Sequence, residues 1–119
     1  METPKEKILI TGALGQIGTE LTVRLSEIYG KENVIASGLD KWKEDITEAG
    51  YYERLDVTNF QAVTDVIKEH NITTVYHLAS LLSGTSEKQP LFAWKLNLDP
   101  LIHLCELAKA GTLKKIFWP

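Results

Sequence analysis

The chain has little that would tie it to an oxidising compartment, to nucleic acid or to a membrane. Its only cysteine is Cys105, so an intramolecular disulfide is impossible and a reducing cytoplasm is the natural setting. A formal net charge of -3 argues against an electrostatic nucleic-acid binder. No apolar stretch approaches the roughly 18 residues of a membrane span, and residues 1–7 are polar rather than a signal peptide. These absences leave one globular domain, without a repeat or a low-complexity segment.

The most informative segment is residues 7–18, where an apolar run ends in three glycines spaced G-x-x-G-x-x-G. The glycines are Gly12, Gly15 and Gly18, and a helical pattern follows at once. The first N–H groups of a helix lack internal partners, and the macrodipole adds partial positive charge, so a pyrophosphate can bind there. Glycine lets the backbone approach the phosphates and lets the helix pack on the strand. The pattern predicts a dinucleotide-binding turn; the alternative is a tight turn without a ligand.

The remaining pattern alternates short strands with helices. We expect strands at 7–11, 33–37, 51–55, 73–78 and from 115, and helices from 17 to Gly30, from Thr58 or Asn59, and at 91–110. Pro100 should interrupt the last helix and Gly111 should end it. This order predicts an α/β fold, a doubly wound parallel sheet of the Rossmann type, with strand order 3-2-1-4-5. A six-stranded sheet would need one more helix–strand unit, so the sheet is expected to be truncated after the fifth strand.

Acidic residues after the second and third strands are candidate ligands for the adenosine half of a dinucleotide. The residue that binds the ribose should lie about 20 positions beyond the glycines, and this position is Gly38. Asp40, two residues later, either reaches the ribose or is a solvated loop charge. Asp56 is placed to reach the adenine edge, to stabilise a turn before the next helix, or to do both. We prefer NAD to NADP, although the lysines near Asp40 could favour a 2′-phosphate.

Further candidates follow the fourth strand. His77 ends that strand, where a lone histidine is more often packed or hydrogen-bonded than catalytic, and no metal partner stands at ligand spacing. Ser83 and Thr85 lie in a loop that either faces the nicotinamide and substrate or is simply surface. Asn97 could order the following helix against the site. Cys105 falls in an apolar helical stripe and is expected to be inert core.

Several of these segments resemble the extended short-chain dehydrogenase/reductase superfamily of sugar-nucleotide epimerases and dehydratases. They are residues 11–18, 55–57 and 77–80, followed by Asn97, in the superfamily's order and spacing. Within the superfamily, the chain is most similar to L-threonine 3-dehydrogenases of the short-chain type. That similarity rests on residues 15–21, 33–37, 81–83, 87–88, 93–94, 97 and 114–119.

The resemblance implies a cofactor, a substrate and a set of contacts. NAD would contact the glycine turn, the end of the third strand and the end of the fourth (Gly12, Gly15, Gln16, Ile17, Gly18, Asp56, Val57, Leu78, Ala79 and Ser80, with Asp40 and Asn97 as further candidates). Ser83 and Thr85 would border a small-molecule substrate, an amino acid. The reaction would be hydride transfer from the C3 carbinol of L-threonine to NAD, giving 2-amino-3-ketobutyrate, a step of threonine catabolism. The resemblance also allows a homo-oligomer.

The chain departs from the superfamily's pattern at two points. The superfamily's base is a tyrosine followed four residues later by lysine, but the four tyrosines here are followed at that spacing by Asn33, Leu55, Asp56 and Ser80. Gly38 also replaces the usual acidic residue. We therefore expect residues 1–119 to be the NAD-binding, N-terminal part of a longer enzyme, inactive alone. The alternatives are part of an NAD-dependent sugar-nucleotide epimerase or dehydratase, and a stand-alone, non-catalytic nucleotide-binding module.

Overall fold

A parallel five-stranded sheet forms the centre of the molecule. The computed structural model describes residues 6–39, 51–79 and 90–119. The strands are β1 (Ile8–Thr11), β2 (Val34–Gly38), β3 (Tyr51–Arg54), β4 (Thr74–His77) and β5 (Lys115–Phe117), and their order is β3-β2-β1-β4-β5. Every neighbouring pair is parallel. The predicted fold class and strand order are confirmed.

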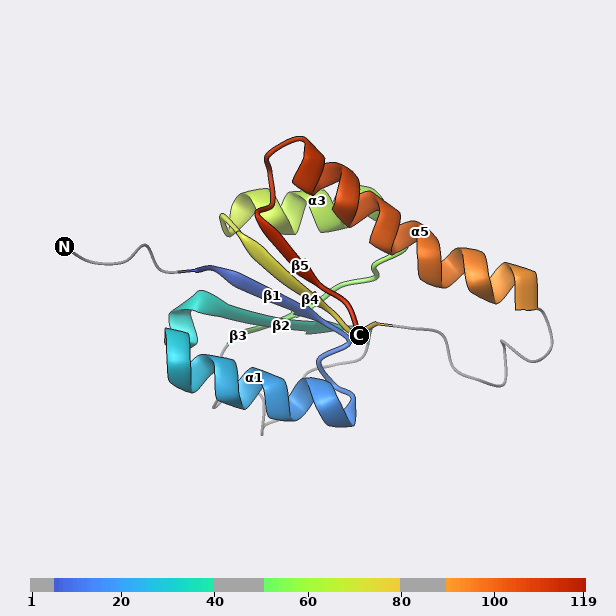
Figure 1. Ribbon diagram of the computed structural model, residues 1–119. Coiled ribbons are helices and arrows are strands. Elements are labelled where there is room, and N and C mark those ends of the chain that lie inside the picture. Colours follow the sequence, from blue (N-terminus) through green and yellow to red (C-terminus); the bar gives the residue numbers. More distant parts are fainter. Residues whose placement is uncertain (1–5, 40–50, 80–89) are drawn as a thin grey trace.

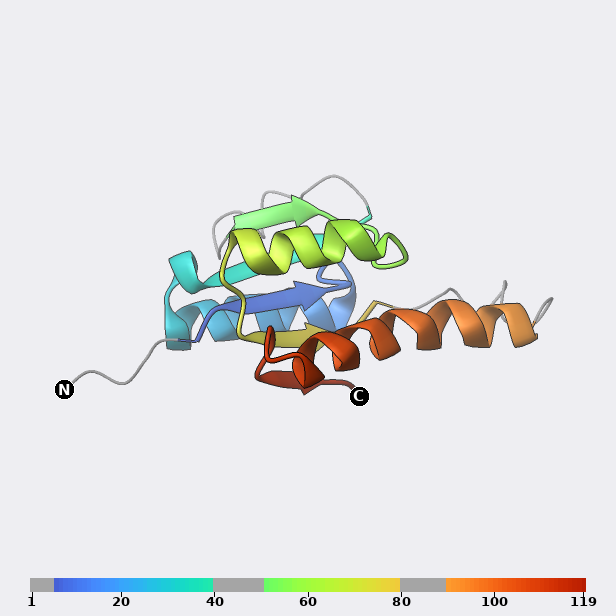
Figure 2. The same ribbon diagram turned by 90° about the horizontal axis from the view of Figure 1, so that it is seen from above.

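Helices cover both faces of this sheet. They are α1 (Gln16–Tyr29), the short 3-10 helix η1 (Lys31–Asn33), α3 (Phe60–Glu69) and α5 (Pro90–Lys109). Figure 1 shows α1 on one face and α3 with α5 on the other, and Figure 2 shows the strands running the same way between them. No helix in the described ranges is both long enough and apolar enough to cross a bilayer.

The alternation of side chains along β1 explains why its apolar run is continuous. Successive strand residues point to opposite faces, so a strand covered on both faces needs apolar side chains throughout. Leu9 belongs to the cluster under α3 and α5, whereas Ile8 and Ile10 belong to the cluster under α1. All three side chains are fully buried. The first strand is thus held between two separate cores, which fixes the position of the turn that follows it.

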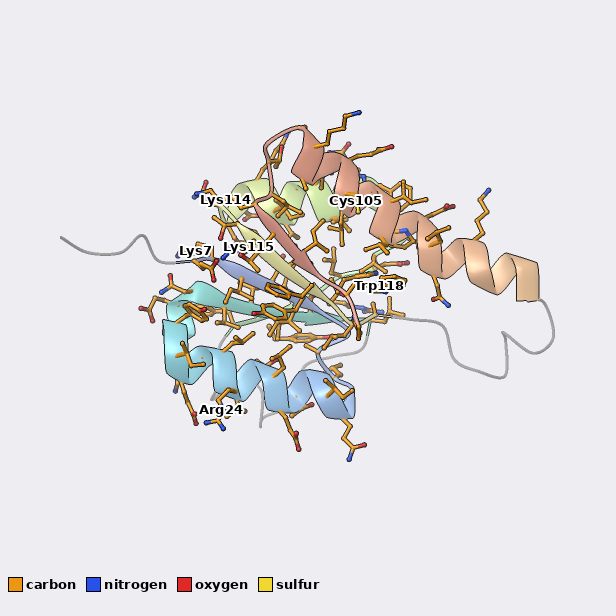
Figure 3. All side chains as sticks on the ribbon, viewed as in Figure 1. Lys7, Arg24, Cys105, Lys114, Lys115 and Trp118 are labelled. Carbon is orange, nitrogen blue, oxygen red and sulfur yellow. The ribbon has the colours of Figure 1, made fainter. Side chains whose placement is uncertain are left out.

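Two sequence predictions about α5 are wrong. The helix runs through Pro100 without interruption, because proline removes one backbone hydrogen bond while packing of residues such as the buried Leu104 holds the following turns. Cys105 is exposed rather than core (Figure 3). Leu104 carries the buried stripe, and the next residue is rotated by about 100° around the helix axis, which turns Cys105 away from the sheet.

Candidate functional site

The candidate site lies where the strand order reverses, between β1 and β4. Within the sheet, β2 and β3 lie on one side of β1, and the chain then crosses to β4 and β5 on the other side of β1. A crevice forms beyond the carboxyl ends of strands at such a reversal, and ligands of open parallel sheets bind there. In this chain, the glycine turn after β1 meets Leu78 and Ala79, which follow β4.

Two of the three glycines are required by close packing. Gly12 has a φ of +66°, and a Cβ there would lie 2.7 Å from the Ala79 backbone nitrogen and 2.8 Å from the Leu78 carbonyl carbon. A Cβ on Gly18 would lie 2.5 Å from the Gly12 carbonyl oxygen. All three distances are too short for any side chain. The bare backbone therefore lets β1, the start of α1 and the end of β4 meet at one point.

Gly15 differs, because its surroundings leave space for a ligand. It is the N-cap of α1 in extended conformation (φ -72°, ψ 170°), and a Cβ would meet only the Gly12 carbonyl oxygen, at an ordinary 3.5 Å. No side chain caps α1, and its first turn carries no acidic residue. The amides at this helix start, together with the helix dipole, therefore favour an anion. This helix start is flanked by the exposed Gln16 and by Ile17, whose side chain is 70% exposed.

Thr11, which sequence reasoning did not single out as a site residue, ties the two central strands together. Its buried hydroxyl oxygen accepts hydrogen bonds from the backbone N–H groups of Leu78 (3.1 Å) and Ala79 (3.2 Å) and lies 2.8 Å from Nδ1 of His77. A hydroxyl has two lone pairs and one proton, so the proton is donated to Nδ1. This assignment leaves the imidazole proton on Nε2. Thr11 thereby sets the separation of the strand ends that border the crevice.

His77 is a packed and hydrogen-bonded residue, which is the more common role of a lone histidine at a strand end. Its side chain is 1% exposed, and burial lowers the pKa of the imidazole from its usual 6.5 because the charged form is poorly solvated there. The neutral ring that results is the form that accepts the Thr11 proton. His77 therefore positions the end of β4 beneath the crevice.

The end of β2 is connected to the glycine turn by a second buried hydroxyl. Ser37 donates to the Ile10 carbonyl oxygen at 2.8 Å, and its own carbonyl accepts from the Ala13 backbone N–H at 2.9 Å. The next residue, Gly38, is buried, and a Cβ there would lie 3.0 Å from the Tyr52 hydroxyl. A side chain at Gly38 would therefore require the Tyr52 side chain to move slightly.

The predicted residues after β3 occupy an exposed turn. Asp56 Oδ1 accepts from the backbone N–H (2.9 Å) and the hydroxyl (2.7 Å) of Thr58, so the turn interpretation of Asp56 is confirmed. Asn59 caps α3 by accepting from the Ala62 N–H at 3.1 Å. Val57 is half-buried against the α3-side core. Contact of Asp56 and Val57 with adenine stays a prediction.

The other predicted ligands divide between the described and undescribed parts of the chain. Gly12, Gly15, Gly18, Leu78 and Ala79 are brought together where the strand order reverses. Asn97 is half-buried on α5. Asp40, Ser80, Ser83 and Thr85 lie outside the described residues. Thr11 and Ser37 could have been found in the sequence as hydroxyl residues placed where buried apolar strands end.

Comparisons with known proteins identify what the chain is similar to. The family described as "NAD dependent epimerase/dehydratase family" matches residues 8–118. An uncharacterized epimerase/dehydratase of Staphylococcus haemolyticus is 47% identical over 109 residues, which are 91% of this chain and 34% of that protein.

Solved structures with the same fold include threonine dehydrogenases. The holo form of the GalE-like L-threonine dehydrogenase from Cupriavidus necator has a TM-score of 0.85 and 43% identity, over 95% of this chain and 36% of that one. The L-threonine dehydrogenase from Clostridium difficile has a TM-score of 0.80 and 48% identity, over 93% of this chain and 35% of that one. The chain thus spans about a third of the length of each of these proteins.

Proposed function

This chain belongs to the NAD dependent epimerase/dehydratase family, and from that premise we propose that it is the NAD-binding part of an L-threonine 3-dehydrogenase. Support for the substrate comes from the two threonine dehydrogenases above, which it resembles closely in both sequence and structure. Support for the cofactor comes from one observation above all. The helix start at Gly15 has no side-chain cap, and a Cβ there would make only one ordinary contact, at the point where the strand order reverses.

The residues that would hold NAD follow from their places around the crevice. Gly12, Gly15 and Gly18 would bring backbone close to the pyrophosphate, with Gln16 and Ile17 beside it. The remaining contacts are proposed at the adenosine end (Asp40, Asp56 and Val57) and at the nicotinamide end (Leu78, Ala79, Ser80 and Asn97). Ser83 and Thr85 are proposed to border the amino-acid substrate.

When bound, NAD supplies a hydride acceptor for the C3 carbinol of L-threonine. The part played by residues 1–119 is binding and orientation: the helix start holds the phosphates, and the Thr11–His77 pair holds the strand ends that border the crevice. Proton removal from the substrate hydroxyl needs a base, and no tyrosine in this sequence has lysine four residues later. We therefore expect the 119-residue chain to bind NAD and to oxidise no threonine.

Calorimetric titration of the chain with NAD tests the cofactor, with NADP and UDP-glucose as comparisons. Saturable NAD binding that exceeds NADP binding supports the proposal. A folded chain that binds no NAD contradicts it, and tight binding of UDP-glucose would favour a sugar-nucleotide epimerase or dehydratase instead.

A chimera tests the substrate. Residues 8–118 of this chain would replace the matching segment of the Cupriavidus necator enzyme, and NADH formation would be followed by its ultraviolet absorbance. L-Threonine oxidation by the chimera is the expected result. A chimera that folds and binds NAD, yet oxidises no L-threonine, would count against the threonine assignment while leaving the cofactor assignment intact.

A further inference from the structure

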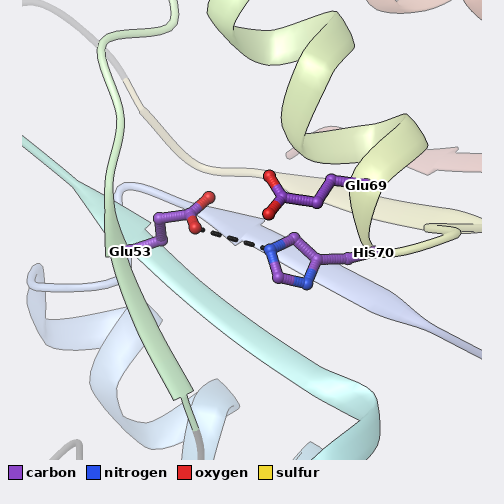
Figure 4. A group of neighbouring side chains, drawn as sticks. All are labelled: Glu53, Glu69 and His70. Carbon is purple, nitrogen blue, oxygen red and sulfur yellow. Dashed lines mark hydrogen bonds and ion pairs between the residues drawn. The ribbon is translucent and has the colours of Figure 1, made fainter.

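A second polar cluster lies between β3 and the C-terminal end of α3. It consists of Glu53 of β3, Glu69 of the last turn of α3, and His70, the C-cap of that helix. One carboxylate oxygen of each glutamate and one imidazole nitrogen lie within 4.8 Å of one another. Figure 4 shows the two carboxylates and the ring turned toward a common centre.

This cluster is separate from the glycine turn. Glu53 and His70 line a groove of about 390 Å³. The same groove is lined by Lys7 and Asn33, which immediately precede β1 and β2, and by Ile72, two residues before β4. Glu53 itself is the third of the four residues of β3 and lies in register with Ser37 of β2. None of the glycine-turn residues lines this groove, so the cluster is distinct from the turn.

The contact between His70 and Glu53 is a long hydrogen bond whose length also suits two ligands of one metal ion. His70 Nε2 and Glu53 Oε1 are 3.4 Å apart, longer than the usual N–H···O distance of about 2.9–3.0 Å. Two ligand atoms that each lie about 2.0–2.1 Å from a tetrahedral Zn²⁺ are about 3.4 Å apart. The observed separation therefore already equals one edge of a zinc coordination tetrahedron.

An independent observation points to the same conclusion. The Glu53 side chain is 37% exposed, but its second carboxylate oxygen, Oε2, is itself buried and has no hydrogen-bond partner among the described residues. A buried acceptor without a partner is costly, more so when it belongs to a carboxylate that faces a second carboxylate. A cation between Glu53 and Glu69 would remove both penalties.

We propose that Glu53, Glu69 and His70 bind one divalent transition-metal ion, best matched by Zn²⁺, with water completing the coordination. An imidazole nitrogen with two carboxylate oxygens is a donor set that Zn²⁺ accepts, whereas Mg²⁺ and Ca²⁺ prefer oxygen ligands alone. The exposed Glu69 side chain can close the remaining distance by a change of rotamer. The ion would link β3, an edge strand of the sheet, to α3. It would stabilise the folded protein, because the unfolded chain lacks the assembled site.

Titration of the metal-free protein with ZnCl₂ tests this site, by calorimetry and by thermal unfolding. We expect one Zn²⁺ per chain and a rise in Tm. His70→Gln and Glu69→Gln should each weaken binding at least about tenfold, because loss of even an outer partner of a metal ligand commonly costs tenfold or more.

Two variants serve as matched controls. Glu106→Gln removes a carboxylate from the exposed face of α5, and Cys105→Ser removes the only thiol; both should keep the wild-type affinity for Zn²⁺. Should His70→Gln fail to fold by circular dichroism, Glu69→Gln decides, because that side chain is exposed. The site is overturned by the absence of saturable Zn²⁺ binding, by binding that survives the ligand substitutions, or by binding that disappears in Cys105→Ser.

Discussion

Replacing Gly15 with aspartate should weaken NAD binding without harming the fold. Gly15 is the N-cap of α1 and has extended backbone angles that an aspartate adopts without strain. A Cβ at this position would make only an ordinary contact, 3.5 Å from the Gly12 carbonyl oxygen. An aspartate would cap the helix with its own carboxylate, in the space that we assign to the pyrophosphate. Gly15→Asn is the matched control, because asparagine caps a helix equally well and has nearly the same size without the charge.

The size of the effect follows from the charges. Two unit charges about 4 Å apart repel by about 1 kcal/mol in bulk water and by about 4 kcal/mol at an effective dielectric constant of 20. The pyrophosphate carries two negative charges and Gly15 is exposed, so the repulsion is at least about 2 kcal/mol. This corresponds to NAD binding about thirtyfold weaker in Gly15→Asp than in Gly15→Asn. The free energy of unfolding should instead rise by about 0.3–1 kcal/mol, since an acidic residue at a helix start is favourable.

Two measurements separate the effects on the fold and on the site. Urea unfolding gives the stability of both variants, and calorimetry gives their dissociation constants for NAD. Added NaCl should narrow the difference in affinity between the aspartate and asparagine variants, because salt screens the repulsion. If both variants are folded and bind NAD equally well, the pyrophosphate is not at the start of α1, and the proposed site is wrong.

Other predictions concern the scaffold beneath the site. Thr11→Val should lower the free energy of unfolding by about 2–4 kcal/mol, because it leaves Nδ1 of His77 and the backbone N–H of Ala79 without their partner. Urea unfolding measures this loss, and Thr11→Ser, which keeps the hydroxyl, should retain most of the stability. Gly18→Ala should cost at least about 2 kcal/mol in the same assay, since its Cβ would lie 2.5 Å from a backbone oxygen, whereas Gly15→Asn should cost little. Burial lowers the folded-state pKa of His77 below its usual 6.5, so the unfolded chain binds more protons as the pH falls. Stability that is present above about pH 6.5 should therefore be lost as the pH falls toward the folded-state pKa, and His77→Gln should flatten this part of a plot of Tm against pH; an unchanged slope would contradict the assignment.

The strand order could be predicted because the apolar pattern and the turn residues of this chain agree. Apolar runs too short for helices alternate with helical patterns, and right-handed crossovers leave few ways to arrange five parallel strands. The glycine turn could be predicted as an anion site because its spacing coincides with a strand end and a helix start. The cap of α3 was narrowed to two neighbours, Thr58 and Asn59, of which Asn59 is the cap.

Other features depend on positions that the sequence pattern does not relate. Thr11 acts through His77, 66 residues later, so its role depends on β4 lying beside β1. Glu53 and His70 are 17 residues apart and meet only when α3 packs back along the sheet. Cys105 was misplaced because an apolar stripe of four residues is compatible with more than one helix rotation, and only packing against the sheet decides between them.

The three glycines of the turn show how fold and function are encoded within seven residues. Gly12 and Gly18 are excluded from bearing a side chain by the protein's own backbone, so they would be required even if nothing bound here. The fold does not require glycine at position 15, because a side chain there would make only an ordinary contact and could cap α1. The backbone N–H groups of an uncapped helix start have no protein partner, which a polar cap at Gly15 would supply. A bound anion would accept hydrogen bonds from these groups and would explain why the cap is absent. Of the three, Gly15 is therefore the residue whose identity argues for a bound anion.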